Sequence, residues 1–381
     1  MRSPAERLLA AALFFTSAGT VHKYGGLTGL AVYASACAAG FVILGRLLSR
    51  TPGPRAEHAA RNFTACGFIL LLAALILIYP KTNAGVFGPG SDRDEDLSRA
   101  CTLTLSGVSP YGELTYSGHP VQAMPGMIAA ALPFHAAGNA AYGNLFWLAA
   151  LFLMLRRQWR STARASLVFW TLLLLSPEIL REFLTGGTLL TNALFISTAV
   201  YWLVDAADSP APARLIAASA LVGALLSSRP NFLLLLPVLS VYLFKRRGAR
   251  MTVVSLGTVL AALAAITASF YLKDPAHFPS AGSFNIFERL AGTLPMTAAM
   301  PFFFAVLSAL LALGTGTRRA DLFFMAGIVQ FLPAASLFFV WLATNGANAF
   351  SFTGYGVASL FFFVFAFGES FRDGLRRQTV A

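Results

Sequence analysis

Apolar runs of roughly the length that crosses a bilayer recur along this chain from one end to the other. Hydrophobic residues make up 57% of the sequence and charged residues only 12%, which excludes an ordinary soluble domain. In lipid, the backbone N–H and C=O groups of a spanning segment must be paired internally, and over about 20 apolar residues a helix achieves this. The pattern therefore predicts an all-α, polytopic transmembrane helical protein.

We expect about 12 spans, which together form a single transmembrane domain over residues 1–381. The predicted segments are 7–22, 26–47, 63–80, 139–155, 165–180, 186–204, 213–228, 230–244, 251–271, 295–314, 321–342 and 352–371.

The chain has 28 Lys and Arg residues and a net charge of +12, but these cations gather in short clusters between the apolar runs. Such clusters mark the cytoplasmic side of a membrane, so we expect a lipid bilayer and no nucleic acid as a partner. The expected location is the cell membrane, as a multi-pass protein of the bacterial inner-membrane type. With every cluster inside, the segments alternate strictly and the loop 81–120 is extracytoplasmic. The clusters are Arg46–Arg61, Arg156–Arg164, Lys245–Arg250, Arg318–Arg319 and Arg372–Arg377.

A polar stretch from Lys81 to Pro120 interrupts the apolar sequence, and its segment Ser91–Asp96 holds four of the 16 acidic residues of the chain. Leu97, Cys101 and Leu105 follow at helical spacing, which predicts a short amphipathic helix. Ser91 would then be its N-cap, and the acids would fill its first turn. A helix puts Asp92 and Asp96 on one face and turns Asp94 away. Acids in a first turn also complement the helix dipole, and this purely structural role is the alternative for each of them.

The segment 121–136 is apolar but is interrupted by Pro125, Gly126 and Pro133. Counting it as a span would put four arginines outside, so we expect a re-entrant or interfacial helix instead. Residues 81–138 would then form one extracytoplasmic catalytic loop that carries short juxtamembrane helices.

Three features in this loop occur together: the acidic cluster, then Gly107-Val-Ser-Pro-Tyr111, then Met124-Pro-Gly126 at the start of an apolar helix. Their order after an early spanning segment resembles the GT-C glycosyltransferases, and most closely the bacterial mannosyltransferase and arabinosyltransferase type. Weaker similarities are Ser176–Glu182 with Gly186-Gly187, Ser227–Asn231 and Lys273–Pro279.

The resemblance implies an integral-membrane glycosyltransferase. Such an enzyme moves a sugar from a polyprenyl-phosphate donor to an extracytoplasmic glycan, lipid or protein acceptor. It implies that a carboxylate of the first long extracytoplasmic loop is the catalytic base or binds a metal. The matching residues are Asp94 and Asp96, with Asp92 third. A divalent cation is a candidate cofactor, for which the sequence assigns no ligands.

The reaction also needs cations that bind the departing lipid phosphate. Arg229 is the first candidate, because it interrupts an apolar stretch immediately before Pro230, although it is equally suited to capping a hairpin. By topology the other candidates are Lys81, Arg181, Lys273 and Arg289.

Further substrate-binding candidates each have a structural alternative. His119 is suited to a phosphate but is also typical of a solvated loop. Tyr111 and Tyr116 are suited to stacking on a sugar or to an interfacial position. Glu182 is adjacent to Arg181, and an exposed pair of this kind contributes little.

A transporter or flippase of lipid-linked sugars is the alternative function, because it would have a similar number of spans. Transporters place polar groups in broken helices near the midplane, often in two related halves. Here, ionisable residues are nearly absent from the centres of the predicted spans, and the halves do not match. The distribution of charge therefore favours the transferase.

Overall fold

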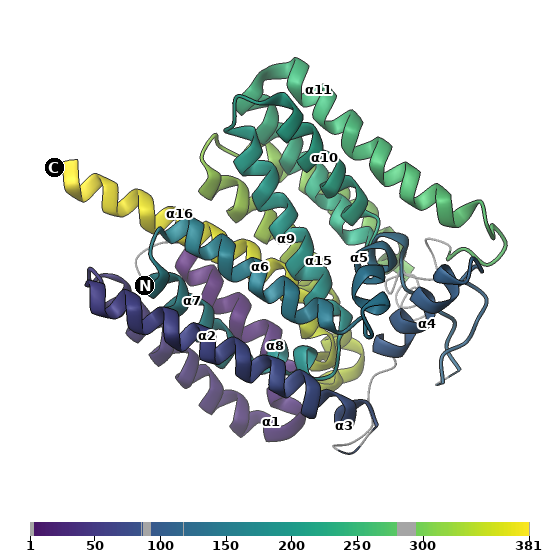
Figure 1. Cartoon of the computed structure of the whole chain (residues 1–381), viewed down its shortest axis with the longest axis horizontal. Helices are drawn as coiled ribbons and strands as arrows, with labels where there is room; N and C mark the ends of the chain where they lie inside the picture. The colour runs from purple at the N-terminus through teal and green to yellow at the C-terminus, as the bar shows by residue number, and fades with distance from the viewer. Residues whose placement is uncertain (1–3, 85, 87–92, 117, 280–294, 381) are drawn as a thin grey trace. The chain divides into compact units, whose positions relative to one another are not determined.

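The computed structural model describes residues 4–84, 86, 93–116, 118–279 and 295–380 of the 381-residue chain (Figure 1). Within these residues the chain is helical, with one isolated backbone bridge between Leu114 and Pro120 and no strand, which confirms the all-α prediction. The helices are α1 (Pro4–Leu48), α2 (Pro54–Leu77), α3 (Tyr79–Asn83), α4 (Arg93–Leu105), α5 (Pro125–Ala136), α6 (Tyr142–Trp159), α7 (Thr162–Leu174), α8 (Pro177–Leu184), α9 (Thr188–Ala207), α10 (Pro212–Leu226), η1 (Pro230–Leu234), α11 (Leu235–Tyr271), η2 (Pro295–Ala299), α14 (Met300–Leu313), α15 (Arg319–Asn345), η3 (Gly346–Gly356) and α16 (Val357–Val380).

Six stretches of the described residues are long and apolar enough to cross a membrane. Three shorter helices of 10–17 residues are also apolar. These helices fit a membrane protein, while the number of 12 spans stays a prediction. The six stretches are Pro4–Leu48, Pro54–Asn83, Thr188–Ala207, Pro230–Tyr271, Arg319–Asn345 and Asn348–Gly374.

The two longest stretches each contain a turn at a glycine. Gly26 has φ 59° and Gly248 has φ 77°, both in the left-handed region that glycine adopts without a steric penalty. Within α1, the hydroxyl of Tyr33 donates to the carbonyl of Leu13, 20 residues earlier, over 3.2 Å. α1 is therefore a helical hairpin, which agrees with the two separate segments that the sequence predicts there.

The chain divides into two compact units, and each is described by itself. Unit 1 consists of residues 1–90, 144–194 and 318–381, and unit 2 of residues 91–143 and 195–317. A single transmembrane domain stays a prediction.

In unit 2, α10 packs closely against the second part of α11. Gly223 faces the carbonyl of Val259 so closely that a Cβ would overlap its oxygen, and the hydroxyls of Ser219 and Ser255 are hydrogen-bonded. α5 contacts the last turn of α10 through Gly126. With 12 residues α5 is much shorter than the about 20 that a span needs, which is compatible with a re-entrant or interfacial helix.

Cations of unit 2 gather at one end of its helices. Arg214 pairs with Asp205 at 2.6 Å and Arg246 with Asp208 at 2.7 Å, so the turn between α9 and α10 contacts the Gly248 turn. Lys245 donates to the carbonyl of Thr315 at 2.7 Å. α4 and α5 lie at the other end of α10 and α11 (Figure 1). The predicted orientation requires the cation clusters of this unit to lie at one end of its helices.

Unit 1 has a cationic end of its own. The carboxylate of Glu57, at the start of α2, accepts hydrogen bonds from Ser161 and from the backbone N–H of Thr162 at the start of α7. Arg164 donates to the carbonyl of Arg50 at 3.3 Å. The turn between α1 and α2 therefore contacts the turn between α6 and α7, and both carry arginine clusters.

The tight contact between α10 and α11 generates a stability prediction. Gly223→Ala should lower the free energy of unfolding by about 1–3 kcal/mol, because the new methyl group cannot fit against Val259. Gly257→Ala on α11 is the matched control: a Cβ at this position would have no atom within 4 Å, and alanine favours the helix by up to about 1 kcal/mol. Thermal unfolding in detergent measures both variants, and equal melting temperatures would contradict this packing.

The separation of charge in unit 2 generates a topology prediction. In a chain without its three native cysteines, a cysteine at His119 or Ala276 should react with a membrane-impermeant thiol reagent added to intact cells. A cysteine at Arg250 should react only after permeabilisation, because the cationic end is expected in the cytoplasm. All three positions are exposed, so burial does not limit the reaction. Labelling at position 250 in intact cells would reverse the orientation.

Candidate functional site

The acidic cluster opens α4, as the sequence predicts. Asp94, Glu95 and Asp96 occupy the first turn of this helix, while Asp92 and the proposed cap Ser91 lie outside the described residues. Asp94 is only 5% exposed and lies on the same helix face as the buried Leu97 and Cys101. It therefore points to a different side from Asp96, as the helical geometry predicts.

The other two acids of this turn bind the loop that follows α4. Oδ1 of Asp96 accepts the backbone N–H of Gln122 at 2.7 Å. The carboxylate of Glu95 accepts the backbone N–H of Tyr116 at 2.9 Å, and Arg99, one turn later, pairs with Glu113 at 2.8 Å. Glu95 and Arg99 thus hold the loop itself, whereas Asp96 binds the segment that leads into α5.

Residues 113–116 and 118–121 pair with each other in the loop between α4 and α5, called here the 113–121 loop. The backbone N–H of Val121 donates to Glu113, and that of Thr115 donates to His119, at 3.0 and 2.8 Å. His119 and Tyr116 are exposed on this loop, where ligands can reach them. The loop is held by Glu95 and Arg99, so its position depends on α4.

Tyr111 does not have the position that a sugar-stacking residue needs. Its ring is 3% exposed, its hydroxyl donates to the carbonyl of Ala123 at 3.1 Å, and it packs against Phe270 and Phe278. Burial, with a contribution from the charge of Asp96, raises the pKa of Tyr111. Tyr111 therefore joins the turn formed by residues 107–112, called here the Pro110 turn, to the end of α11. The sequence did not predict this structural role.

A second polar segment, residues 273–279, lies against the same turn. The side chain of Ser109 contributes to the lowered pKa of Asp274, and the ring of His277 lies next to Gly112. A Cβ at Gly112 would be 3.1 Å from that ring, and its φ of 96° also favours glycine. Two segments that resemble the glycosyltransferase pattern are thus in contact, although they are far apart in the sequence.

Arg229 belongs to the same end of unit 2. It is the N-cap residue of η1 and follows the buried Ser227 and Ser228. Gly126 lies against Ser227 and Ser228 so closely that a Cβ would overlap both. The start of α5 is therefore in direct contact with the turn formed by residues 227–229, called here the Arg229 turn. Gln122, which binds Asp96, lies just before Gly126 in the chain, so one short segment links the acidic helix with this turn.

The remaining candidates are in unit 1, except Arg289, which lies outside the described residues. Lys81 is exposed on the short helix α3, whose neighbour Thr82 donates to the carbonyl of Leu184 at 2.6 Å. α3 is therefore fixed against the end of α8, which carries Arg181 and Glu182.

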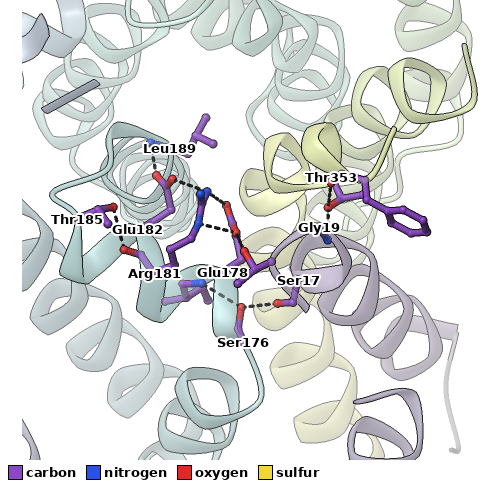
Figure 2. A network of polar contacts seen from close by, with 12 residues as sticks. Ser17, Gly19, Ser176, Glu178, Arg181, Glu182, Thr185, Leu189 and Thr353 are labelled. Atoms are coloured by element: carbon purple, nitrogen blue, oxygen red, sulfur yellow. Dashed lines mark hydrogen bonds and ion pairs between the residues drawn. The ribbon is translucent and has the colours of Figure 1, made fainter. Parts of the chain in front are cut away.

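Arg181 is held by two buried carboxylates (Figure 2). It donates from Nε and an Nη to Glu178 at 3.1 and 2.6 Å, and to Glu182 at 3.2 Å. Glu178 and Glu182 are 3% and 2% exposed, whereas the side chain of Arg181 is 36% exposed. The Arg181–Glu182 pair that the sequence suggests does form, but it is not an exposed pair, because both acids are buried and Glu178 is a third member.

Glu178 also connects α8 with two other elements. The hydroxyl of Thr20 in α1 donates to it, and a Cβ at Gly354 of η3 would lie 2.5 Å from its Oε1. Nearby, Ser17 and Ser176 are hydrogen-bonded at 3.0 Å, and Leu189 donates its backbone N–H to Glu182 at 3.0 Å (Figure 2). Burial alone would lower the pKa of Arg181, but Glu178 and Glu182 outweigh it and raise the pKa. Arg181 therefore stays charged.

No three His, Cys, Asp or Glu side chains in the described part of the chain are arranged to hold a metal ion. Asp94 and Asp96 point to different sides of α4, which explains why the sequence cluster does not become a compact set of ligands among these residues.

The network around Arg181 generates a prediction. Arg181→Ala should lower the free energy of unfolding by about 3 kcal/mol, because it leaves Glu178 and Glu182 buried without their cation. Arg318→Ala is the control, since Arg318 pairs with Asp321 at 2.7 Å but is 60% exposed, and about 1 kcal/mol or less is expected. Melting temperatures in detergent compare the two, and equal losses would show that the α8 network adds no more than a surface pair.

The residues of this site have to be interpreted by their own geometry. No protein-family model, curated protein or solved structure matches this chain. The functional proposal therefore rests on the contacts among α4, α5, the Pro110 turn, the Arg229 turn and the Lys273–Phe278 segment.

Proposed function

We propose that this protein is an integral-membrane glycosyltransferase similar to the GT-C superfamily, with about 12 spans. It would move a sugar from a polyprenyl-phosphate donor to an extracytoplasmic glycan, lipid or protein acceptor. One observation carries the proposal. The acidic helix α4, the Arg229 turn, the Pro110 turn and the Lys273–Phe278 segment are joined through their contacts at one end of unit 2, while the cation clusters gather at the other end.

The chemistry of transfer needs groups of both charges. The acceptor hydroxyl must lose a proton as its oxygen attacks the anomeric carbon, and the bond from that carbon to the donor phosphate must break. The proton passes to a base, and both electrons of the broken bond leave with the phosphate. A cation near the phosphate stabilises the charge that develops there.

Asp96 suits the role of the base better than Glu95 does. Glu95 accepts the N–H of Tyr116 with both oxygens, at 3.2 and 2.9 Å, and so fixes the exposed loop. Asp96 accepts the N–H of Gln122 on the segment that leads to the Arg229 turn, and this link supports Asp96 as the base. Asp94 is the second candidate, because it is the buried aspartate of the same helical turn.

Arg229 is the proposed ligand of the donor phosphate. Its turn contacts the start of α5, and the backbone just before α5 binds Asp96. Guanidinium and phosphate match in geometry and charge. Arg181 and Lys81, the other cations that the sequence predicts, belong to unit 1, where Glu178 and Glu182 fix the orientation of Arg181.

Three variants of α4 test the proposal. Asp96→Asn or Asp94→Asn should reduce transfer of labelled mannose or arabinose from a polyprenyl-phosphate donor by on the order of a hundredfold or more, the contribution of a positioned base. Asparagine at position 96 keeps an oxygen that can accept from Gln122, so the loop should remain in place. Glu95→Gln is the matched control, because its amide oxygen can still accept from Tyr116, and near-normal transfer is expected.

The outcomes separate the competing functions. If both aspartate variants transfer sugar normally, the acids only cap α4 and the proposed catalytic base is wrong. If the wild-type protein moves lipid-linked sugars across vesicles without forming a new glycosidic bond, the chain is a flippase.

A further inference from the structure

The Lys273–Phe278 segment carries a side-chain pair that the proposed mechanism leaves unused. Nδ1 of His277 lies 3.0 Å from both oxygens of Asp274, and the backbone N–H of His277 also faces this carboxylate at 3.3 Å. The hydrogen bond from His277 holds the pKa of Asp274 below its usual range, so the carboxylate is ionised at neutral pH. With Nδ1 directed at Asp274, Nε2 is the ring atom that can meet a ligand.

The pair is fixed in position rather than free on a loop. Gly112 makes room for the imidazole ring, and Phe278 packs edge-on against Tyr111 with ring centroids 5.2 Å apart. Phe278 also packs against Tyr271 at 5.5 Å. His277 nevertheless remains 61% exposed. A ring that is held from one side and open on the other can bind a ligand without first being ordered.

The position of the Asp274–His277 pair, just beyond the apolar end of α11, indicates the kind of ligand. α11 ends at Tyr271, and both Tyr271 and the following Leu272 expose apolar side chains, Leu272 to 74%. Lys273 follows at once and is exposed. An apolar helix face that gives way to Lys and His within a few residues is the arrangement expected where lipid tails meet phosphate head groups.

We propose that His277, oriented by Asp274 and accompanied by Lys273, binds a lipid-borne phosphoryl group through Nε2. A protonated ring donates a charge-assisted hydrogen bond from Nε2 to a phosphate oxygen, and Lys273 adds a second positive charge on the same segment. The site deepens the proposed function and rests on it, because the proposed donor and its leaving group carry such a phosphate. The sequence predicts Lys273 as a phosphate ligand, but it does not assign a role to His277 or Asp274.

Binding to the purified full-length protein in detergent tests the proposal without requiring sugar transfer. Farnesyl phosphate serves as a short polyprenyl phosphate, and farnesol serves as the same chain without the phosphate. His277→Gln should raise the Kd for farnesyl phosphate by on the order of tenfold, the usual effect of losing one charge-assisted hydrogen bond. Asp274→Asn should raise it less, and His277→Lys should restore part of the affinity because it restores a charge.

His58→Gln is the matched control, since His58 is also an exposed histidine but lies in α2, within the arginine cluster Arg46–Arg61. It should leave the Kd unchanged, and none of the variants should alter the binding of farnesol. Phosphatidylglycerol and inorganic phosphate, used as competitors, distinguish a bilayer head group and a free phosphate from a polyprenyl phosphate. Competition by phosphatidylglycerol as strong as by farnesyl phosphate would support the site and identify bilayer lipid as its source.

An unchanged Kd in His277→Gln would overturn the proposal, as would tight binding of inorganic phosphate with none of farnesyl phosphate. If His277→Gln abolished transfer but left the Kd unchanged, the pair would act on a proton and the phosphoryl contact would be wrong. If the wild type bound farnesyl phosphate through His277 but transferred no sugar, the phosphoryl site would stand and the transferase proposal would fail.

Discussion

Lipid offers no partner for a backbone N–H or C=O, and the remaining features of this chain follow from that constraint. A helix satisfies these groups within itself, which is why the apolar runs become helices and why irregular backbone is confined to their ends. The chain reverses at Gly26 and Gly248, where a positive φ allows a tight turn. The ion pairs Arg214–Asp205 and Arg246–Asp208 accordingly lie where helices end or reverse.

The two ends of unit 2 differ in charge and in construction. At one end, short turns carry cations that bind neighbouring turns, as Arg246 does with Asp208 and Lys245 with Thr315. At the other end, α4 opens with acids and a polar loop follows it, whose backbone is held by carboxylates and by an apolar cluster around Tyr111. Among the described residues of unit 2, the longer loops lie at this acidic end, between α4 and α5 and after α11.

Carboxylates have three different roles in this structure, although the sequence presents them as similar. Glu95 binds a backbone N–H group and fixes a loop, Glu178 is buried with Arg181 and connects three elements, and Asp96 binds the segment that leads to the Arg229 turn. The environment sets these roles, because burial and hydrogen bonding decide whether a carboxylate stabilises the fold or remains able to take a proton.

The sequence by itself determined the helical fold and the helix that opens with Asp94–Asp96. It also determined the break between the predicted segments 7–22 and 26–47, and the break between 230–244 and 251–271. These features follow from the sequence because backbone pairing and helical periodicity are local constraints. It did not determine that Tyr111 is buried, that Glu178 completes the Arg181 network, or that Asp274 and His277 lie against Ser109 and Gly112. Those are contacts between residues far apart in the chain or facing inward from a helix. Only tertiary packing decides them, since a side chain's exposure and partners depend on which segments fold against it.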